Sequence, residues 1–196
     1  MTKIVGLLAL QGDFAAHRRM MERCNLDIVV REMRDKSTFE ECDALVIPGG
    51  ESTTMSCLCD RYDLWNPMRE RSQNGMPVLG TCAGLIMLAH DISGASNNMQ
   101  QKTLDVLDIS VARNAYGRQI DSFEADLPAP SLGDEPLHAV FIRAPQISRV
   151  GQNVQILATF RDQPVAVQSG KIVGATFHPE MSDDIRLHQY WLELFA

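Results

Sequence analysis

The chain has 196 residues, 45% of them hydrophobic, and a formal net charge of −7. This length and composition suffice for one domain with a sizeable core, so we expect a single domain over residues 1–196. No apolar run approaches the ~20 residues of a membrane span, and no basic leader precedes the first apolar segment, which favours the cytoplasm. The acidic balance and the lack of a lysine-arginine cluster argue against a nucleic-acid partner.

The cysteines are odd in number and form no disulfide framework, so we interpret them as reduced thiols: Cys24, Cys42, Cys57, Cys59 and Cys82. The C-x-C pair at 57 and 59 has no matching histidine or cysteine pair elsewhere, so it is interpreted as part of a helix face and not as a zinc site. We expect neither a metal ion nor an organic cofactor.

The first half of the chain alternates strands and helices, as in a parallel sheet covered on both faces. Apolar patterning predicts strands over Ile4–Leu10, Asp27–Met33, Ala44–Ile47 and Val78–Gly80. Helices are expected from a cap at Asp13 to about Cys24, through Thr53–Leu58, and over the segment in which Leu85, Leu88, Ala89 and Ile92 follow helical spacing.

The second half changes to strands separated by turns, which favours an antiparallel extension or hairpins. The expected strands are Val106–Val111, Ser122–Ala125, Ala139–Arg143, Val154–Phe160, Val165–Gln168 and Ile172–Phe177. A closing helix is predicted from Ser182, with Asp183 and Asp184 near its positive end. The fold class is therefore α/β, with three layers: a mostly parallel open sheet, helices on both faces, and an antiparallel extension in the C-terminal half.

An apolar strand turns through two glycines into an apolar helix in the run Gly80-Thr81-Cys82-Ala83-Gly84. In nucleophile elbows of the G-x-S-x-G kind, this tight turn exposes the central residue above the sheet. The start of the helix points backbone N–H groups and partial positive charge at the sulfur, which favours the thiolate. The pattern predicts that Cys82 is a nucleophile, although a lone cysteine behind a strand is also often a small buried hydrophobe.

A cysteine nucleophile needs a base and a third group that orients the base. Four of the five histidines are interpreted as ordinary surface or structural residues: His17, His90, His138 and His188. His178 differs, because it ends an apolar strand and is followed by Pro179 and Glu180. Residues i and i+2 of an extended segment point to the same side, so we expect Glu180 to hold one imidazole nitrogen and leave the other for Cys82.

Another buried strand ends in two glycines, in the run Pro48-Gly49-Gly50-Glu51-Ser52, and a helix is expected to begin at Ser52 or Thr53. An oxyanion hole beside an elbow uses the N–H of the residue after the nucleophile, Ala83, and a second N–H from such a loop, at Gly49 or Gly50. A phosphate-binding loop is the competing interpretation, but the G-x-x-x-x-G-K-[ST] pattern and its lysine are missing.

Three motifs, in this order, resemble those of the class I, triad-type glutamine amidotransferases: PGGES (48–52), GTCAG (80–84) and HPE (178–180). Further segments are similar to the glutaminase subunits of pyridoxal 5′-phosphate synthase: GLLALQGD (6–13), RNAYGRQ (113–119), FIRAP (141–145) and TFHPE (176–180). The polar linker around Ser93–Lys102 departs from the pattern and touches none of the candidate catalytic positions.

The resemblance implies a Cys82-His178-Glu180 triad that hydrolyses L-glutamine through a γ-glutamyl thioester to L-glutamate and ammonia. It further implies that the ammonia passes to a separate synthase subunit that makes pyridoxal 5′-phosphate, the vitamin B6 product, in a hetero-oligomer with glutaminases around a synthase core. Glutamine is expected to contact Gly50, Glu51, Ser52, Arg113, Ile142 and Arg143. Arginine suits its carboxylate, because the planar guanidinium makes two parallel hydrogen bonds.

Three alternatives stay open at this point. The chain could serve another ammonia-using synthase, which would keep the triad and change the partner. It could be a different elbow-cysteine hydrolase of the same architecture, which would not release glutamate from glutamine. It could also be a catalytically silent structural partner, but the intact triad argues against this alternative.

We also expect the isolated chain to be a poor glutaminase that its synthase partner activates. Gln11 and Gly12, at the end of the first strand, should lie beside the Gly49-Gly50 loop. A glycine pair can hold its peptide in more than one orientation, and only one presents an N–H to the oxyanion. Gln11 is therefore a candidate gating residue; alternatively, it only hydrogen-bonds its own turn.

Overall fold

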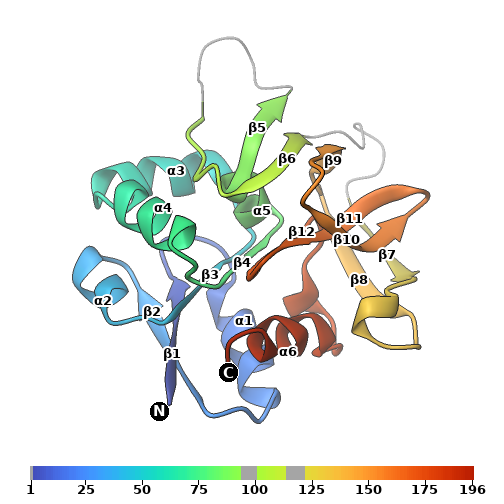
Figure 1. The fold of residues 1–196 in the computed structure, drawn as a ribbon, viewed down its shortest axis with the longest axis horizontal. Coiled ribbons are helices and arrows are strands. Elements are labelled where there is room, and N and C mark those ends of the chain that lie inside the picture. Colours follow the sequence, from blue (N-terminus) through green and yellow to red (C-terminus); the bar gives the residue numbers. More distant parts are fainter. Residues whose placement is uncertain (1, 94–100, 114–121) are drawn as a thin grey trace.

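The computed structural model describes residues 2–93, 101–113 and 122–196. Its main sheet has seven strands, in the order β10-β11-β12-β4-β3-β1-β2 (Figure 1). The strands from β12 to β2 run parallel, and β10 and β11 add an antiparallel edge. Their bounds are β1 (Lys3–Leu8), β2 (Ile28–Met33), β3 (Ala44–Ile47), β4 (Val78–Thr81), β10 (Gln155–Phe160), β11 (Gln163–Ser169) and β12 (Ile172–Ala175).

Helices cover both faces of this sheet, which confirms the predicted three-layer α/β class (Figure 1). One face carries α1 (Phe14–Arg23) and α6 (Arg186–Glu193). The other carries α3 (Ser52–Arg61), α4 (Trp65–Gln73) and α5 (Ala83–Leu88), with the short α2 (Lys36–Glu40) at its edge. Within the described residues, no helix combines the length and the apolar character that a membrane crossing needs.

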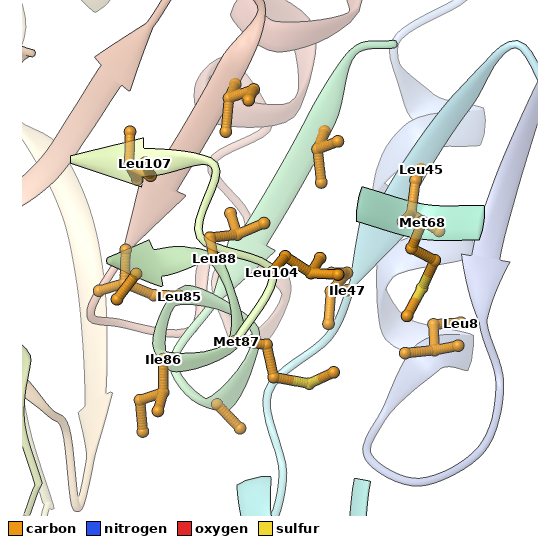
Figure 2. Packing of buried hydrophobic residues seen from close by; sticks show 14 of the residues in the cluster. Leu8, Leu45, Ile47, Met68, Leu85, Ile86, Met87, Leu88, Leu104 and Leu107 are labelled. Carbon is orange, nitrogen blue, oxygen red and sulfur yellow. The ribbon is translucent and has the colours of Figure 1, made fainter. Parts of the chain in front are cut away.

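The strands divide their side chains between two hydrophobic cores, because successive residues of a strand point to opposite faces. In β3, Leu45 and Ile47 belong to the core under α3, α4 and α5, whereas Ala44 and Val46 belong to the core under α1 and α6. Figure 2 shows Leu45 and Ile47 on the same side as Met68. A strand buried on both faces explains why the sequence around β3 is continuously apolar.

Two small sheets complete the fold. The first has the order β5-β6-β9, and the second is the β7-β8 hairpin. Their bounds are β5 (Ala89–Ser93), β6 (Leu107–Ala112), β9 (Gln146–Val150), β7 (Ser122–Leu127) and β8 (Leu137–Ile142). Phe123 of the hairpin stacks on Phe141 with ring centroids 4.5 Å apart, and Phe141 contacts Phe177, so the hairpin is anchored beside the end of β12.

Several predicted boundaries are wrong. The helix after Cys82 ends at Leu88, and Ala89–Ser93 instead pairs with β6. Every residue of α5 is buried, and periodicity cannot distinguish helix from strand in a fully buried run. The closing helix begins at Arg186 and not at Ser182, because Asp184 accepts from the Arg186 N–H at 3.0 Å in a turn before it. The elements α2, α4 and β9 were not predicted.

Candidate active site

Cys82 lies on the turn between β4 and α5, in a conformation that side chains rarely adopt. Its backbone has φ 48° and ψ −101°, and its N–H donates to the Ala175 carbonyl of the neighbouring strand at 2.8 Å. A positive φ in a residue other than glycine costs free energy and persists only where its surroundings fix it. The turn leaves Cys82 only 7% exposed, at the wall of a cavity.

The glycines on either side of Cys82 allow this turn to pack closely. A Cβ atom at Gly84 would lie 2.0 Å from the carbonyl oxygen of Ile47 in β3. A Cβ atom at Gly80 would lie 2.8 Å from the carbonyl oxygen of Gly84. Such contacts are far inside van der Waals distance, so neither position has room for a side chain.

The predicted partners of the nucleophile also come together. The Nδ1 atom of His178 lies 2.7 Å from Oε1 of Glu180, and the His178 N–H donates to the carbonyl of Val140 at 2.8 Å. The expected extended path between them is wrong, because Pro179–Met181 forms a short 3₁₀ helix, η2. Glu180 still reaches back to His178 and is itself 6% exposed.

Burial and the close ionisable groups shift the pKa values of this pair in opposite directions. For His178, desolvation lowers the pKa, but hydrogen bonds with Cys82 and Glu180 outweigh it and raise the pKa to about 10. For Glu180, desolvation raises the pKa, but His17 and His178 outweigh it and bring the pKa to about 2. Both shifts favour the state that forms when His178 has taken a proton, an imidazolium beside a carboxylate.

The glycine loop after β3 borders the same site. A Cβ atom at Gly49 would lie 2.3 Å from Cε1 of His178, so only glycine fits beside the imidazole. A Cβ atom at Gly12 would lie 2.0 Å from the carbonyl oxygen of Gly49, which confirms that the end of β1 borders this loop. Gln11 accepts from the Glu51 N–H at 2.7 Å, so its side chain bonds the glycine loop rather than only its own turn.

A cavity of about 420 Å³ opens in front of Cys82. It lies at the carboxyl ends of the parallel strands, where ligands bind in open α/β sheets. Two of the predicted site residues, Gly49 and Glu180, stand behind its wall. The others all line it: Gln11, Gly50, Glu51, Ser52, Cys82, Ala83, Arg113, Ile142, Arg143 and His178.

Arg113 is held by groups of the chain at the cavity wall. Its Nη1 donates to Oε1 of Gln101 at 2.8 Å, and its Nη2 lies 3.5 Å from Oε1 of Glu51. The Glu51 carboxylate also accepts from the Thr53 and Thr54 N–H groups, so it caps α3, which begins at Ser52 as expected. Desolvation raises the pKa of Glu51, but these two hydrogen bonds and a third from the Thr54 hydroxyl outweigh it and lower the pKa to about 2.

Arg143 also lines the cavity, and it is exposed, with φ 44°. Of the motif that begins at Arg113, residues 114–119 lie outside the described residues, as do residues 94–100 of the polar linker.

Sequence reasoning missed three residues at the site. Gln101 contacts Ser52 and Arg113, and nothing in its polar surroundings signals this. His17 and His188, interpreted as ordinary, are completely buried, and Nε2 of His17 lies 3.2 Å from Oε2 of Glu180. The sequence feature that could have identified His17 as a buried residue is its position on the apolar face of α1, with Met20 and Met21.

No group of side chains in the described part of the chain could hold a metal ion. The arrangement instead provides a cysteine, a histidine-carboxylate pair and backbone N–H groups around one cavity. Such groups serve acyl transfer to a thiol.

The fold and the elbow together define the class of protein, an α/β protein with a nucleophile elbow at the carboxyl end of a central strand. The chain belongs to the SNO glutamine amidotransferase family, whose profile matches residues 7–196.

Relatives at high identity agree with this family. The chain is 46% identical over 189 residues to a Kosmotoga olearia protein named pyridoxal 5′-phosphate synthase subunit PdxT, covering 96% of each. It is 48% identical to the Pelotomaculum thermopropionicum protein of the same name, over 96% of this chain and 93% of that one. A crystal structure of a glutamine amidotransferase superposes with a TM-score of 0.88 at 46% identity, covering 97% of both chains.

Proposed function

We propose that this chain is the glutaminase subunit of a pyridoxal 5′-phosphate synthase and acts as one domain. The observation that carries the proposal is the 2.7 Å contact between His178 and Glu180 at a cavity that also contains the strained Cys82. Family membership supports glutamine as the substrate. The names of the relatives support vitamin B6 synthesis as the pathway that uses the released ammonia.

The reaction follows from the roles that the geometry allows. His178, oriented by Glu180, takes the thiol proton, and the Cys82 sulfur attacks the side-chain amide carbon of glutamine. The N–H of Ala83 and one N–H from Gly49 or Gly50 stabilise the oxyanion. Collapse of the tetrahedral intermediate breaks the C–N bond, and the imidazolium protonates the leaving ammonia. Water then cleaves the γ-glutamyl thioester and releases glutamate.

Selection of glutamine rests on the distance between a carboxylate clamp and the sulfur. Arg113 and Arg143 stand on the cavity wall, where they can hold the α-carboxylate. One methylene in a pocket is worth only about 1–3 kcal/mol. A clamped asparagine is instead rejected because its shorter side chain stops short of Cys82.

Ammonia released into water is lost, so the glutaminase is expected to work only when a synthase subunit is docked, in a cytoplasmic hetero-oligomer with glutaminases around a synthase core. The docking surface surrounds the cavity at the carboxyl ends of the parallel strands. The Glu51 N–H donates to Gln11 and not into the cavity. Docking, sensed through Gln11, selects the loop orientation in which an N–H faces the oxyanion.

The test is glutamate release with and without the purified synthase. We expect strong stimulation of the wild-type chain and weak stimulation of Gln11→Ala. Gln189→Ala is the matched control, because Gln189 lies in α6 and its side chain donates to Glu193, away from the cavity. Full activity of the isolated wild-type chain would refute activation by the synthase. Normal stimulation of Gln11→Ala would show that Gln11 takes no part in that activation. Absence of glutamate release under both conditions would refute the glutaminase itself, and capture of a different synthase would identify another pathway.

A further inference from the structure

Buried polar side chains continue the triad into the core between α1 and α6. Oε1 of Glu180 faces His178, and Oε2 of Glu180 lies 3.2 Å from Nε2 of His17. The Nδ1 atom of His17 lies 2.9 Å from Nε2 of His188. Both histidines are completely buried. One carboxylate therefore stands between the catalytic imidazole and a histidine pair that no solvent reaches.

The surroundings keep both buried histidines neutral. Desolvation lowers the pKa of His17 more than the nearby Glu180 and Asp13 raise it, and the neighbouring His178 lowers it further. Desolvation, together with His17, brings the pKa of His188 to about 3, although Glu180 opposes this. A neutral imidazole carries one N–H, so its tautomer decides which neighbour receives a hydrogen bond.

The position of Glu180 determines which tautomer His17 adopts. Nε2 of His17 faces two oxygens, Oε2 of Glu180 at 3.2 Å and Oγ1 of Thr81 at 3.1 Å. An unprotonated Nε2 would turn its lone pair toward a carboxylate, which is repulsive. A protonated Nε2 donates its one N–H to Oγ1 of Thr81 and places its partial positive charge 3.2 Å from Oε2, which has no hydrogen-bond partner among the described residues. The Nδ1 atom of His17 then accepts from the Nε2–H of His188.

We propose that His17 is a positioning residue for the triad: the partial positive charge of its Nε2–H, 3.2 Å from Oε2 of Glu180 and backed by His188, keeps the carboxylate in place so that Oε1 stays aligned on His178. This inference rests on the proposed glutaminase function. It assigns His17 no contact with substrate, because His17 does not line the cavity.

The first test reads the tautomer in the wild-type chain and needs no variant. Imidazole ¹⁵N chemical shifts of the histidine-labelled protein are measured from pH 5 to pH 9. We expect His17 to stay neutral with the proton on Nε2 throughout. A proton on Nδ1 of His17, or its titration in this range, would overturn the proposal whatever the glutaminase activity is.

The second test compares His17→Leu with His17→Gln, both assayed in the complex with the synthase. Leucine removes the donor, whereas the glutamine amide can place an N–H near the position of Nε2. We expect His17→Leu to lower kcat by about 10- to 100-fold, because the buried carboxylate loses a close electrostatic partner, and to leave KM nearly unchanged. His17→Gln should recover most of kcat.

The pH profile separates positioning from general loosening of the fold. Without the His17 donor, the buried Glu180 carboxylate is stabilised less, so the acid limb of kcat/KM in His17→Leu should move to higher pH. The titratable groups that face this carboxylate are His178 on one side and His17, backed by His188, on the other. His138→Leu is the control, because His138 pairs with Asp126 and Glu124 at an exposed edge and should keep the wild-type profile.

Three results would contradict the proposal: an unmoved acid limb in His17→Leu, an equal loss of kcat in the leucine and glutamine variants, or a KM effect larger than the kcat effect. A wild-type complex that releases no glutamate would refute the proposed function and leave the tautomer measurement to decide the inference.

Discussion

The two walls of the cavity are built differently. Behind Cys82, β3 approaches Gly84 and α5 approaches Gly80 so closely that neither glycine admits a side chain. On the substrate-holding side, Arg113 is held by side chains, those of Gln101, Thr53 and Glu51, and Arg143 is exposed. The reacting groups thus depend on backbone geometry, and the groups that hold the substrate depend on adjustable contacts.

This difference indicates how the two sides respond to substitution. Changes on the rigid side should alter kcat, because they displace groups that act only in the transition state. Changes on the clamp side should alter KM, since a carboxylate clamp binds ground state and transition state alike. The predictions below measure this division.

The largest effect is expected from Cys82→Ala. The variant loses the covalent route but little volume, so glutaminase activity should fall by about 10⁶-fold, as for other triad nucleophiles, with the fold kept. Glutamate release and circular dichroism, measured on the complex and the free chain, check both parts. A variant that keeps a tenth of the activity would refute the assignment of the nucleophile.

The next largest effects are expected from the other two triad members, His178 and Glu180. His178→Ala should lose more activity than Glu180→Gln, because an amide can still hold the ring approximately in place whereas the base has no substitute. For Glu180→Gln we expect a loss on the order of 10²–10⁴ in kcat. Equal kcat values for wild type and Glu180→Gln would exclude Glu180 from the mechanism.

A smaller effect is expected on the clamp side. Arg113→Ala and Arg143→Ala should each raise KM for glutamine by about 10- to 100-fold, the contribution of hydrogen bonds to a charged group, with a smaller change in kcat. Arg149→Ala is the matched control, because Arg149 pairs with Asp108 outside the cavity. Unchanged KM in both variants would refute the clamp and the division between the two walls.

The smallest effect concerns stability at acid pH. Folding lowers the pKa of His188 to about 3 and that of Glu180 to about 2, so below pH 6.5 the unfolded chain binds more protons than the folded one. The free energy of unfolding should therefore fall as pH decreases from 6.5 to 4, as measured by urea titration. His188→Gln should reduce this pH dependence, and an equal dependence in both proteins would contradict a neutral buried His188.

The sequence is sufficient to predict the rigid side, because its constraints are local. Gly80 and Gly84 mark the elbow, and His178 and Glu180 stand two residues apart, so the site can be assembled from short motifs even though the path between them is a 3₁₀ turn. The parallel sheet follows equally from the continuously apolar strand at Ala44–Ile47.

The contacts of His17 and Gln101 could not be predicted, because they join residues far apart in the chain. His17 meets His188 across 171 positions, and Gln101 meets Ser52 across 49. The run after Cys82 shows a second limit: burial on all sides removes the polar face that reveals where a helix ends, so Ala89–Ser93 could not be distinguished as a strand.

Covalent labelling with a glutamine-like chloroketone tests the central claim most directly, because the chain contains its own control. Cys57 is the exposed cysteine of the five, whereas Cys82 is almost buried. Peptide mapping by mass spectrometry should find one adduct, on Cys82, formed faster with the synthase present and suppressed by glutamine. An adduct on Cys57 alone, or labelling of Cys82 that glutamine does not suppress, would contradict a nucleophile poised in a glutamine site.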